Sequence, residues 1–343
     1  MNGNLKVLDD LTNRVNESAQ RLRVAGHINE ITDREAMGLN DALVDFYSDV
    51  MTQLNSRMWG KSTAELRDIA QSQRSHVLER LCAANALNFS DARRADELPE
   101  FLDIPAGSFW QGTDETAVTA IWKKYSHLGV ERNWIEKETP KHEVKISRFT
   151  LSKYPITNRQ YKLFLTETGS PSLPSSWHFG GYPTHLANHP VYTLKLTDID
   201  LYCEWLSRKI GLVVRLPTES EWEYAGGNGF GWQYTWGNDF APFHCNTNEA
   251  LLQSTTPVGI FLESTNRWGI ADLIGNVEEF VSDDYMPYPG ARIVEDDLYK
   301  KLGRYRIAKG GAFNRFSDLA RVQRRHGAYP SSLYAIGFRV ACS

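Results

Sequence analysis

The chain has 343 residues, of which 41% are hydrophobic and 12% aromatic, a length and composition that predict two domains with large buried cores. Its net charge of −4 provides no basic footprint, so we expect neither nucleic acid nor an anionic membrane as a partner. The sequence shows no basic-then-apolar leader and no apolar run of about 18 residues, which predicts a cytoplasmic protein without a membrane span.

The first ninety or so residues have the spacing of amphipathic helices. Apolar residues recur at intervals of three and four over residues 5–22 and again over residues 36–54. A third helix is expected over residues 62–87, opened by a Ser-Thr-Ala-Glu capping-box pattern. We therefore predict a helical N-terminal domain or arm over residues 1–97, used for assembly or for contact with a partner.

Residue types that bind metals are scattered along the chain. The four cysteines stand far apart and outside any CxxC spacing, which predicts reduced structural thiols: Cys82, Cys203, Cys245 and Cys342. The N-terminal histidines stand alone, and three more lie in a loop rich in Gly and Pro, where ligand geometry is poor: His27 and His76, then His178, His185 and His189. We expect no metal at either group.

Beyond residue 98 tryptophan and glycine become frequent, and turn signals recur every ten or so residues. Three short helices are predicted, at residues 157–168, 197–210 and 218–225. Near the end of the chain, two strands opened by glycines are predicted at residues 309–313 and 336–340. The segment between these strands, residues 313–335, has neither strand nor helix periodicity, so we expect a solvent-facing loop that carries function.

A series of motifs runs in order through this second region: IPAGSF (104–109), YPITN (154–158), RLPTESEWEYA (215–225), WGN (236–238), GNVEEF (275–280), KGGAF (309–313) and IGFR (336–339). Together they resemble the formylglycine-generating enzyme (sulfatase-modifying factor) superfamily. The resemblance implies an α+β, C-type-lectin-like fold with much irregular structure over residues 98–343.

The resemblance also implies which redox sites to look for. Formylglycine-generating enzymes bind copper through two cysteines shortly after the Gly-Gly motif, because thiolates suit Cu(I). Arg315 and Ala320 stand at those positions, so we expect no copper and no formylglycine synthesis. A second branch, resembling the sulfoxide synthases, binds non-haem iron through three histidines of a helical domain. His27 and His76 lack a third partner and the HxxxH spacing, so no iron is expected.

A structural calcium site is a further implication of the resemblance. Relatives hold Ca²⁺ with loop carbonyls and with the Asn and Glu of a GNxxE motif, and oxygen-rich irregular loops suit this cation. The matching residues here are Asn276, Val277 and Glu279, although Glu278 and Phe280 replace the tryptophans usual in the motif. The alternative is that Asn276 bonds loop backbone while Glu279 pairs with an arginine.

The C-terminus is similar to the variable proteins of diversity-generating retroelements, a third branch. These proteins place a hypervariable patch between a GG[SA][FW]N motif and IGFR, and residues 310–314 and 336–339 bracket such a segment here. The segment contains Tyr, Ser, Gly and Asn, the residue types that antibody paratopes use. We predict a ligand-binding surface over about 313–335, formed by Asn314, Phe316, Ser317, Asp318, Leu319, His326, Tyr329, Ser331, Ser332, Leu333 and Tyr334.

Three arginines of the segment have two interpretations. Arg321, Arg324 and Arg325 could anchor an anionic partner, or they could pair with the acidic residues 295–297. Structural pairing of at least one of them is the favoured interpretation.

Two classes of function follow. The leading prediction is a non-enzymatic protein that displays an exposed, variable C-terminal surface towards another protein, with possible self-association through the N-terminal helices. The alternative is an oxidoreductase of the same superfamily that uses an unrecognised site.

Overall fold

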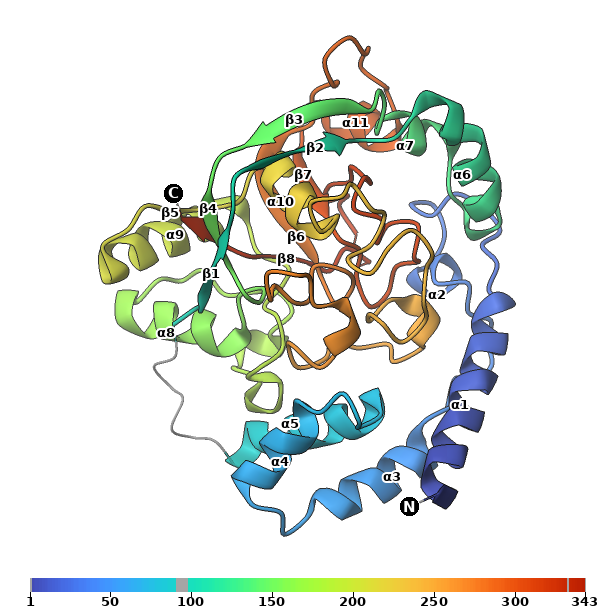
Figure 1. Cartoon of the computed structure of the whole chain (residues 1–343), viewed down its shortest axis with the longest axis vertical. Coiled ribbons are helices and arrows are strands. Elements are labelled where there is room, and N and C mark those ends of the chain that lie inside the picture. Colours follow the sequence, from blue (N-terminus) through green and yellow to red (C-terminus); the bar gives the residue numbers. More distant parts are fainter. Residues whose placement is uncertain (1, 91–97, 332, 343) are drawn as a thin grey trace.

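The computed structural model describes residues 2–90, 98–331 and 333–342 (Figure 1). The N-terminal helices form a band along one side and the lower edge of a body made by the rest of the chain (Figure 1). These helices are α1 (Asn2–Gln20), α2 (Asp33–Ala36), α3 (Ser48–Met58), α4 (Thr63–Ala70) and α5 (Val77–Ser90). Among the described residues, no helix combines the length and the apolar character needed to cross a bilayer.

Two of the predicted N-terminal helices are broken. The stripe expected over residues 36–54 fails because α2 ends near Gly38, whose φ is +68°, and Leu43 is 89% exposed. The helix expected over residues 62–87 is divided into α4 and α5. Between them, the Ser72 hydroxyl accepts a hydrogen bond from the Arg74 amide, and such local bonds compete with helical ones.

Three small sheets form the frame of the body. The first has the order β1-β4-β9-β5 and is antiparallel throughout, the second pairs β2 with β3, and the third has the order β7-β6-β8 with β6 and β8 parallel. Their bounds are β1 (Phe101–Ile104), β2 (Gly107–Gln111), β3 (His142–Ile146), β4 (Phe149–Ser152), β5 (Val214–Arg215), β6 (Glu278–Asp284), β7 (Arg306–Lys309), β8 (Ile336–Phe338) and β9 (Ala341–Cys342).

The three helices predicted for the body are confirmed to within one residue at each end: α8 (Asn158–Thr168), α9 (Leu196–Ile210) and α10 (Glu219–Gly226). Thr157 and Thr218 cap α8 and α10 in capping boxes. Three further helices were not predicted from the sequence: α6 (Val118–Tyr125), α7 (Arg132–Glu136) and α11 (Asp297–Leu302).

The glycines near the C-terminus end a strand instead of opening one. β7 stops at Lys309, and Gly310 and Gly311 follow with φ of +101° and +71°. A Cβ on Gly310 would lie 2.7 Å from the Leu273 carbonyl oxygen, so only glycine fits this approach. The strand prediction for residues 309–313 was therefore wrong, whereas the second predicted strand begins correctly at Ile336.

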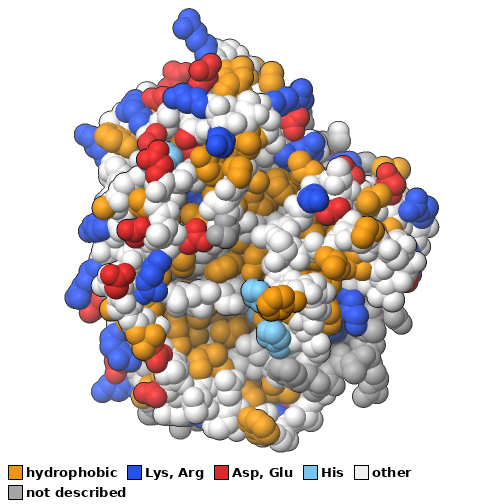
Figure 2. Space-filling model, turned by 180° about the vertical axis from the view of Figure 1, so that it is seen from behind, with side chains coloured by type: hydrophobic (Ala, Val, Ile, Leu, Met, Phe, Trp, Pro, Cys, Tyr) orange, Lys and Arg blue, Asp and Glu red, His pale blue; other side chains and the backbone are white. Residues whose placement is uncertain are grey.

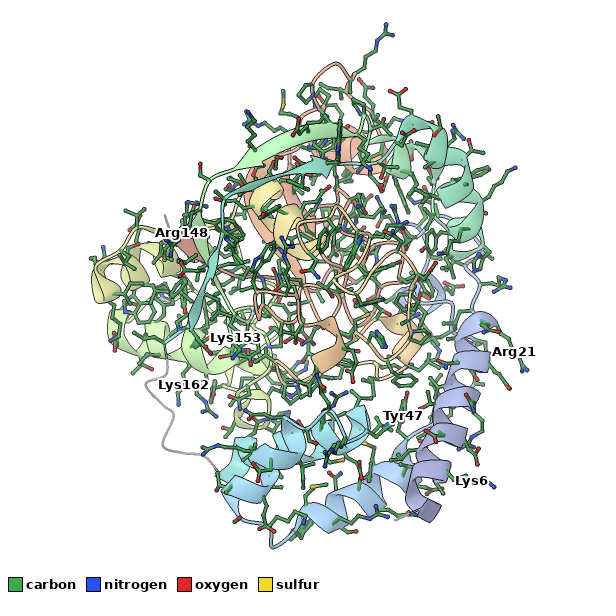
Figure 3. All side chains as sticks on the ribbon, in the orientation of Figure 1. Lys6, Arg21, Tyr47, Arg148, Lys153 and Lys162 are labelled. Atoms are coloured by element: carbon green, nitrogen blue, oxygen red, sulfur yellow. The ribbon has the colours of Figure 1, made fainter. Side chains whose placement is uncertain are left out.

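The N-terminal helices and the body share one hydrophobic core. Leu11 of α1 and Leu78 of α5 belong to the same cluster of buried side chains as Phe316 and Phe338. Lys6 and Arg21 point away from the body on the outer face of α1, whereas Tyr47 lies at the junction with it (Figure 3). The predicted boundary near residue 97 therefore does not separate two independent cores.

Polar contacts cross the same junction. The Tyr47 hydroxyl donates to the Ala250 carbonyl, and Arg80 donates two hydrogen bonds of 3.0 and 2.9 Å to the Glu263 carboxylate. The face shown in Figure 2 carries Lys and Arg side chains interspersed with Asp and Glu, without a large patch of one sign.

Candidate functional site

The segment 313–335 runs through the interior. The prediction that it forms an exposed surface is wrong for seven of the eleven residues chosen, which are buried: Asn314, Phe316, Ser317, Asp318, Leu319, Leu333 and Tyr334. His326 and Tyr329 are half-buried, Ser331 is exposed, and Ser332 lies outside the described residues. Its apolar side chains complete the core, while local turns such as that from Leu319 N to Phe316 O satisfy its backbone.

The three arginines of the segment form buried ion pairs. Arg321 donates bonds of 2.9 and 2.6 Å to Glu138, and Arg324 donates one of 3.2 Å to Asp318. The structural interpretation is therefore correct, but the partners are not those expected from the acidic run at 295–297. Within that run, Asp296 pairs instead with Lys137.

The third arginine, Arg325, belongs to a charge cluster that includes two glutamates of α10. Arg325 donates bonds of 2.8 and 2.9 Å to Glu219, and Lys309 lies 2.8 Å from Glu223 and 3.5 Å from Glu219. Burial acts to raise the pKa of Glu219, but the charges of Arg325 and Lys309 outweigh it and lower that pKa. Each of these buried charges thus has a partner, as the cost of burying a charge requires.

In the GNxxE motif, Asn276 bonds loop backbone and Glu279 pairs with an arginine, which is the alternative to a calcium site. The Asn276 side chain accepts a 2.9 Å bond from the Thr256 amide and donates one of 3.1 Å to the Thr256 carbonyl. Glu279 accepts bonds of 2.6 and 2.8 Å from Arg339, and another of 2.7 Å from Trp222. The side-chain oxygen of Asn276 and both carboxylate oxygens of Glu279 are thus engaged, so these two side chains do not fit a calcium ion.

The positions expected for a copper pair carry a cation and a methyl group. The Arg315 guanidinium lies 5.1 Å from the centre of the Tyr334 ring, and Ala320 packs closely against Gly311. Neither residue can supply a thiolate, so the site does not fit copper. Within the part of the chain that the structure describes, no three His, Cys, Asp or Glu side chains are grouped to hold a metal.

A pocket of about 520 Å³ opens beside Ser317, where the N-terminal band meets the body. We call it the Glu249 pocket. Its walls come from α1, α6, the turn after α6, and the short 3-10 helix Asn248–Ala250. The lining residues are Asn16, Ala19, Gln20, Lys124, Tyr125, His127, Leu128, Asp239, Phe240, Pro242, Glu249 and Ser317.

Glu249 is the unusual group of this pocket. Its Oε1 accepts a 2.8 Å bond from the Ser317 amide, whereas Oε2 is buried without a hydrogen-bond partner among the described residues. Burial raises the pKa of Glu249, because a low-dielectric site disfavours the carboxylate, and this outweighs the hydroxyl groups of Thr247 and Ser317, which act to lower that pKa. An unpaired buried carboxyl oxygen is a ready acceptor for a donor group on a ligand.

The turn that carries Glu249 is fixed from two sides. On the N-terminal side, Asn248 donates a 2.7 Å bond to the Met37 carbonyl. On the C-terminal side, the Asn248 amide donates a 2.9 Å bond to the Arg315 carbonyl. The pocket therefore exists only where three distant parts of the chain meet.

Two phenols lie in contact beside the same pocket. The Tyr125 and Tyr234 hydroxyls are 3.1 Å apart, and Tyr234 donates a 3.1 Å bond to the Ser317 carbonyl. Burial raises the pKa of Tyr234 well above its usual value, so this phenol stays protonated. Of these polar groups only Ser317 was predicted from the sequence, because Tyr125, Tyr234 and Glu249 lie in no motif that marks them.

Comparison with known proteins identifies the family. Residues 86–343 match the model of the sulfatase-modifying factor enzyme 1-like domain. The chain belongs to this family. The mouse formylglycine-generating enzyme is 25% identical over an aligned length of 319 residues. The match covers 75% of this chain and 79% of that enzyme. The family resemblance predicted from the motifs is thus confirmed.

Solved structures of two other proteins share the fold. PvdO from Pseudomonas aeruginosa superposes with a TM-score of 0.56 at 26% identity, covering 72% of this chain and 95% of that one. Treponema denticola variable protein 1 superposes with a TM-score of 0.52 at 20% identity, covering 71% and 94%. The predicted α+β, C-type-lectin-like fold is confirmed, and at 20% identity the second likeness shows the fold alone.

Proposed function

We propose that this chain is a ligand-binding member of the sulfatase-modifying factor family, and that the Glu249 pocket takes a small organic molecule bearing an ammonium, amidinium or hydroxyl donor. The observation that carries the proposal is the buried Glu249 Oε2 without a partner. Leaving such an acceptor unpaired costs about 1–3 kcal/mol, which a donor on a ligand would recover. The aromatic walls at Tyr125 and Phe240 suit the apolar part of such a molecule.

The chemistry of the mouse relative is not part of this proposal. Its name describes formylglycine generation, and the copper pair that the resemblance implies is replaced here by Arg315 and Ala320. An enzyme of another kind acting in the same pocket is the second candidate. The contact between the Tyr125 and Tyr234 phenols favours it, because a chain of hydroxyls beside a carboxyl group can move a proton.

A protein partner at the segment 313–335 stays a prediction, but for a smaller surface. Within this segment Ala328, Pro330 and Ser331 are exposed, so a protein that binds there would contact this tip. Self-association through the N-terminal region also remains a prediction.

The proposal is tested by screening the full chain against small amines, guanidines and alcohols, with thermal shift first and titration calorimetry second. Ligand binding should disappear in Glu249→Gln, which removes the carboxylate, and in Ala19→Leu, which fills the pocket from α1. Glu143→Gln, an exposed change on β3, is the matched control and should bind as the wild type does. Equal binding by all variants, or a screen without a saturating ligand, would overturn the proposal.

Two further assays separate the alternatives. Mass spectrometry of the bound compound after incubation should find it unchanged, whereas turnover abolished by Glu249→Gln would favour the enzyme. Copper analysis together with a cysteine-containing sulfatase peptide should give neither stoichiometric copper nor conversion of the peptide.

A further inference from the structure

A second cavity lies at another part of the junction between the N-terminal helices and the body. It has a volume of about 160 Å³ and is bounded by α4, α5, the first turn of α8 and residues 257–260. None of its lining residues belongs to the Glu249 pocket. We call it the Arg159 cavity.

Arg159 is the group that makes this cavity unusual. Arg159 is only 8% exposed, and its Nη1 has no hydrogen-bond partner among the described residues. The backbone of Arg159 is already fixed, because its amide donates a 2.9 Å bond to the Ala187 carbonyl at the start of α8. The Arg159 side chain also bonds the Tyr182 hydroxyl. A guanidinium cannot lose its charge at ordinary pH, so Arg159 lines the cavity as a permanent cation with one donor nitrogen unused.

The other walls add positive charge and neutral polar groups. Arg67 of α4 lines the cavity opposite α8, and the described lining residues include no Asp or Glu. Behind the wall at Gly259, the Asp272 carboxylate accepts a bond from the Gly259 amide and interacts with the charge of Arg339. Neutral polar side chains complete the lining: Gln71, Tyr154, Thr157, Gln160 and Asn188.

We propose that the Arg159 cavity binds a small oxyanion of the phosphate class, either inorganic phosphate or the head of a small phosphate ester. Guanidinium groups match the oxygens of phosphate with paired, directional hydrogen bonds, and arginines on opposite walls suit a tetrahedral anion. Apolar residues beside them, among them Ala84 and Ile260, leave room for the short organic part of an ester.

Such a ligand would connect the N-terminal helices to the body. Arg67 belongs to α4 and Arg159 to α8, so an anion held by both adds a link between two regions that also meet through the Asn88 hydrogen bond to the His185 carbonyl. Binding to the folded chain alone raises its stability by mass action. Phosphate should therefore slow amide exchange in α4 and α5 more than in the sheets of the body.

The test is titration calorimetry of the full chain with inorganic phosphate and with methyl phosphate. We expect saturable binding to the wild type and a loss of at least about tenfold in affinity in Arg159→Gln. Arg159→Lys should lose less, because lysine keeps the charge but lacks the paired N–H donors of the guanidinium. Arg148→Gln is the control, because Arg148 is an exposed arginine paired with Asp103. Tighter binding of methyl phosphate identifies an ester as the ligand, and equal affinities identify the ion.

A cavity-filling variant guards against misfolding of the arginine variants. Ala84→Leu leaves every charge in place and occupies the space, so it should abolish binding while its circular dichroism stays that of the wild type. No saturable heat at millimolar phosphate would overturn the proposal, as would equal losses in Arg148→Gln and Arg159→Gln. Because the Glu249 pocket is untouched, either site can fail without the other.

Discussion

The Tyr334 hydroxyl donates a 2.6 Å hydrogen bond to the side-chain carbonyl of Asn29. This bond joins the residues just before β8 to the turn between α1 and α2, at opposite ends of the chain. Asn29 also donates to Asp297 at the start of α11. The N-terminal band therefore covers part of the segment that a displayed surface would have to leave open.

We predict that a fragment of residues 98–343 is less stable than the full chain and exposes apolar surface. The domain boundary predicted near residue 97 implies that this fragment folds independently, but Leu11 and Leu78 share a core with Phe316 and Phe338. Thermal unfolding and binding of a hydrophobic dye measure the effect. A fragment that begins at residue 72 keeps α5 and should be intermediate, and an unchanged thermal midpoint in the shorter fragment would restore the original boundary.

Phe316→Ala should lower the free energy of unfolding by about 3–5 kcal/mol, as expected for a large side chain removed from a core. Phe316 is 3% exposed, like the framework residue Phe338, for which we expect a similar loss. The control is Ala328→Ser at the exposed tip, which should change stability by no more than about 0.5 kcal/mol. Urea unfolding distinguishes these values, and a negligible loss at Phe316 would revive the displayed surface.

Sequence reasoning succeeded where a short stretch of chain decides the structure. Thr157 and Thr218 form capping boxes, and α8 and α10 begin within one residue of the predicted starts. It failed for the segment 313–335, because Arg321 and Arg325 find their partners 183 and 106 residues earlier in the chain. No periodicity inside the segment reports such distant pairs. Glu249 was not predicted from the sequence for the same reason, since its pocket is made by three separate parts of the chain.

Stability should fall as the pH is lowered from neutral, partly through His189. Burial lowers the pKa of His189 to about 3, and its ring contacts the Thr255 hydroxyl at 3.0 Å. With the unfolded pKa near 6.5, the unfolded chain binds a proton between about pH 6.5 and 3 that the folded chain refuses. Each pH unit in that window removes about 1.4 kcal/mol at this residue.

The His189 contribution is measured by urea unfolding of the wild type and of His189→Asn at pH 7, 6 and 5. The unfolding free energy of the variant should fall less steeply with decreasing pH, by the slope that one bound proton contributes, because asparagine does not titrate. Other histidines whose pKa is lowered, such as His326, are present in both proteins and cancel in the difference. Identical slopes would show that His189 is not kept neutral by the fold.

Glu138→Gln should cost about 3–5 kcal/mol of folding free energy, because it leaves the Arg321 charge buried and unpaired. Both side chains of this pair are fully buried, and Glu138 also accepts a 2.6 Å bond from the Thr113 hydroxyl. The matched control is Asp103→Asn, which breaks the pair with Arg148 at side chains that are 61% and 71% exposed.

The exposed pair should contribute no more than about 1 kcal/mol, since water and salt screen it. Replacing both Glu138 and Arg321 by apolar residues of similar volume should cost less than Glu138→Gln alone, because no uncompensated charge remains. Equal losses in Glu138→Gln and Asp103→Asn would mean that water reaches Arg321. The segment 313–325 would then be more open in solution than its buried ion pairs indicate, and it would be available to a ligand after all.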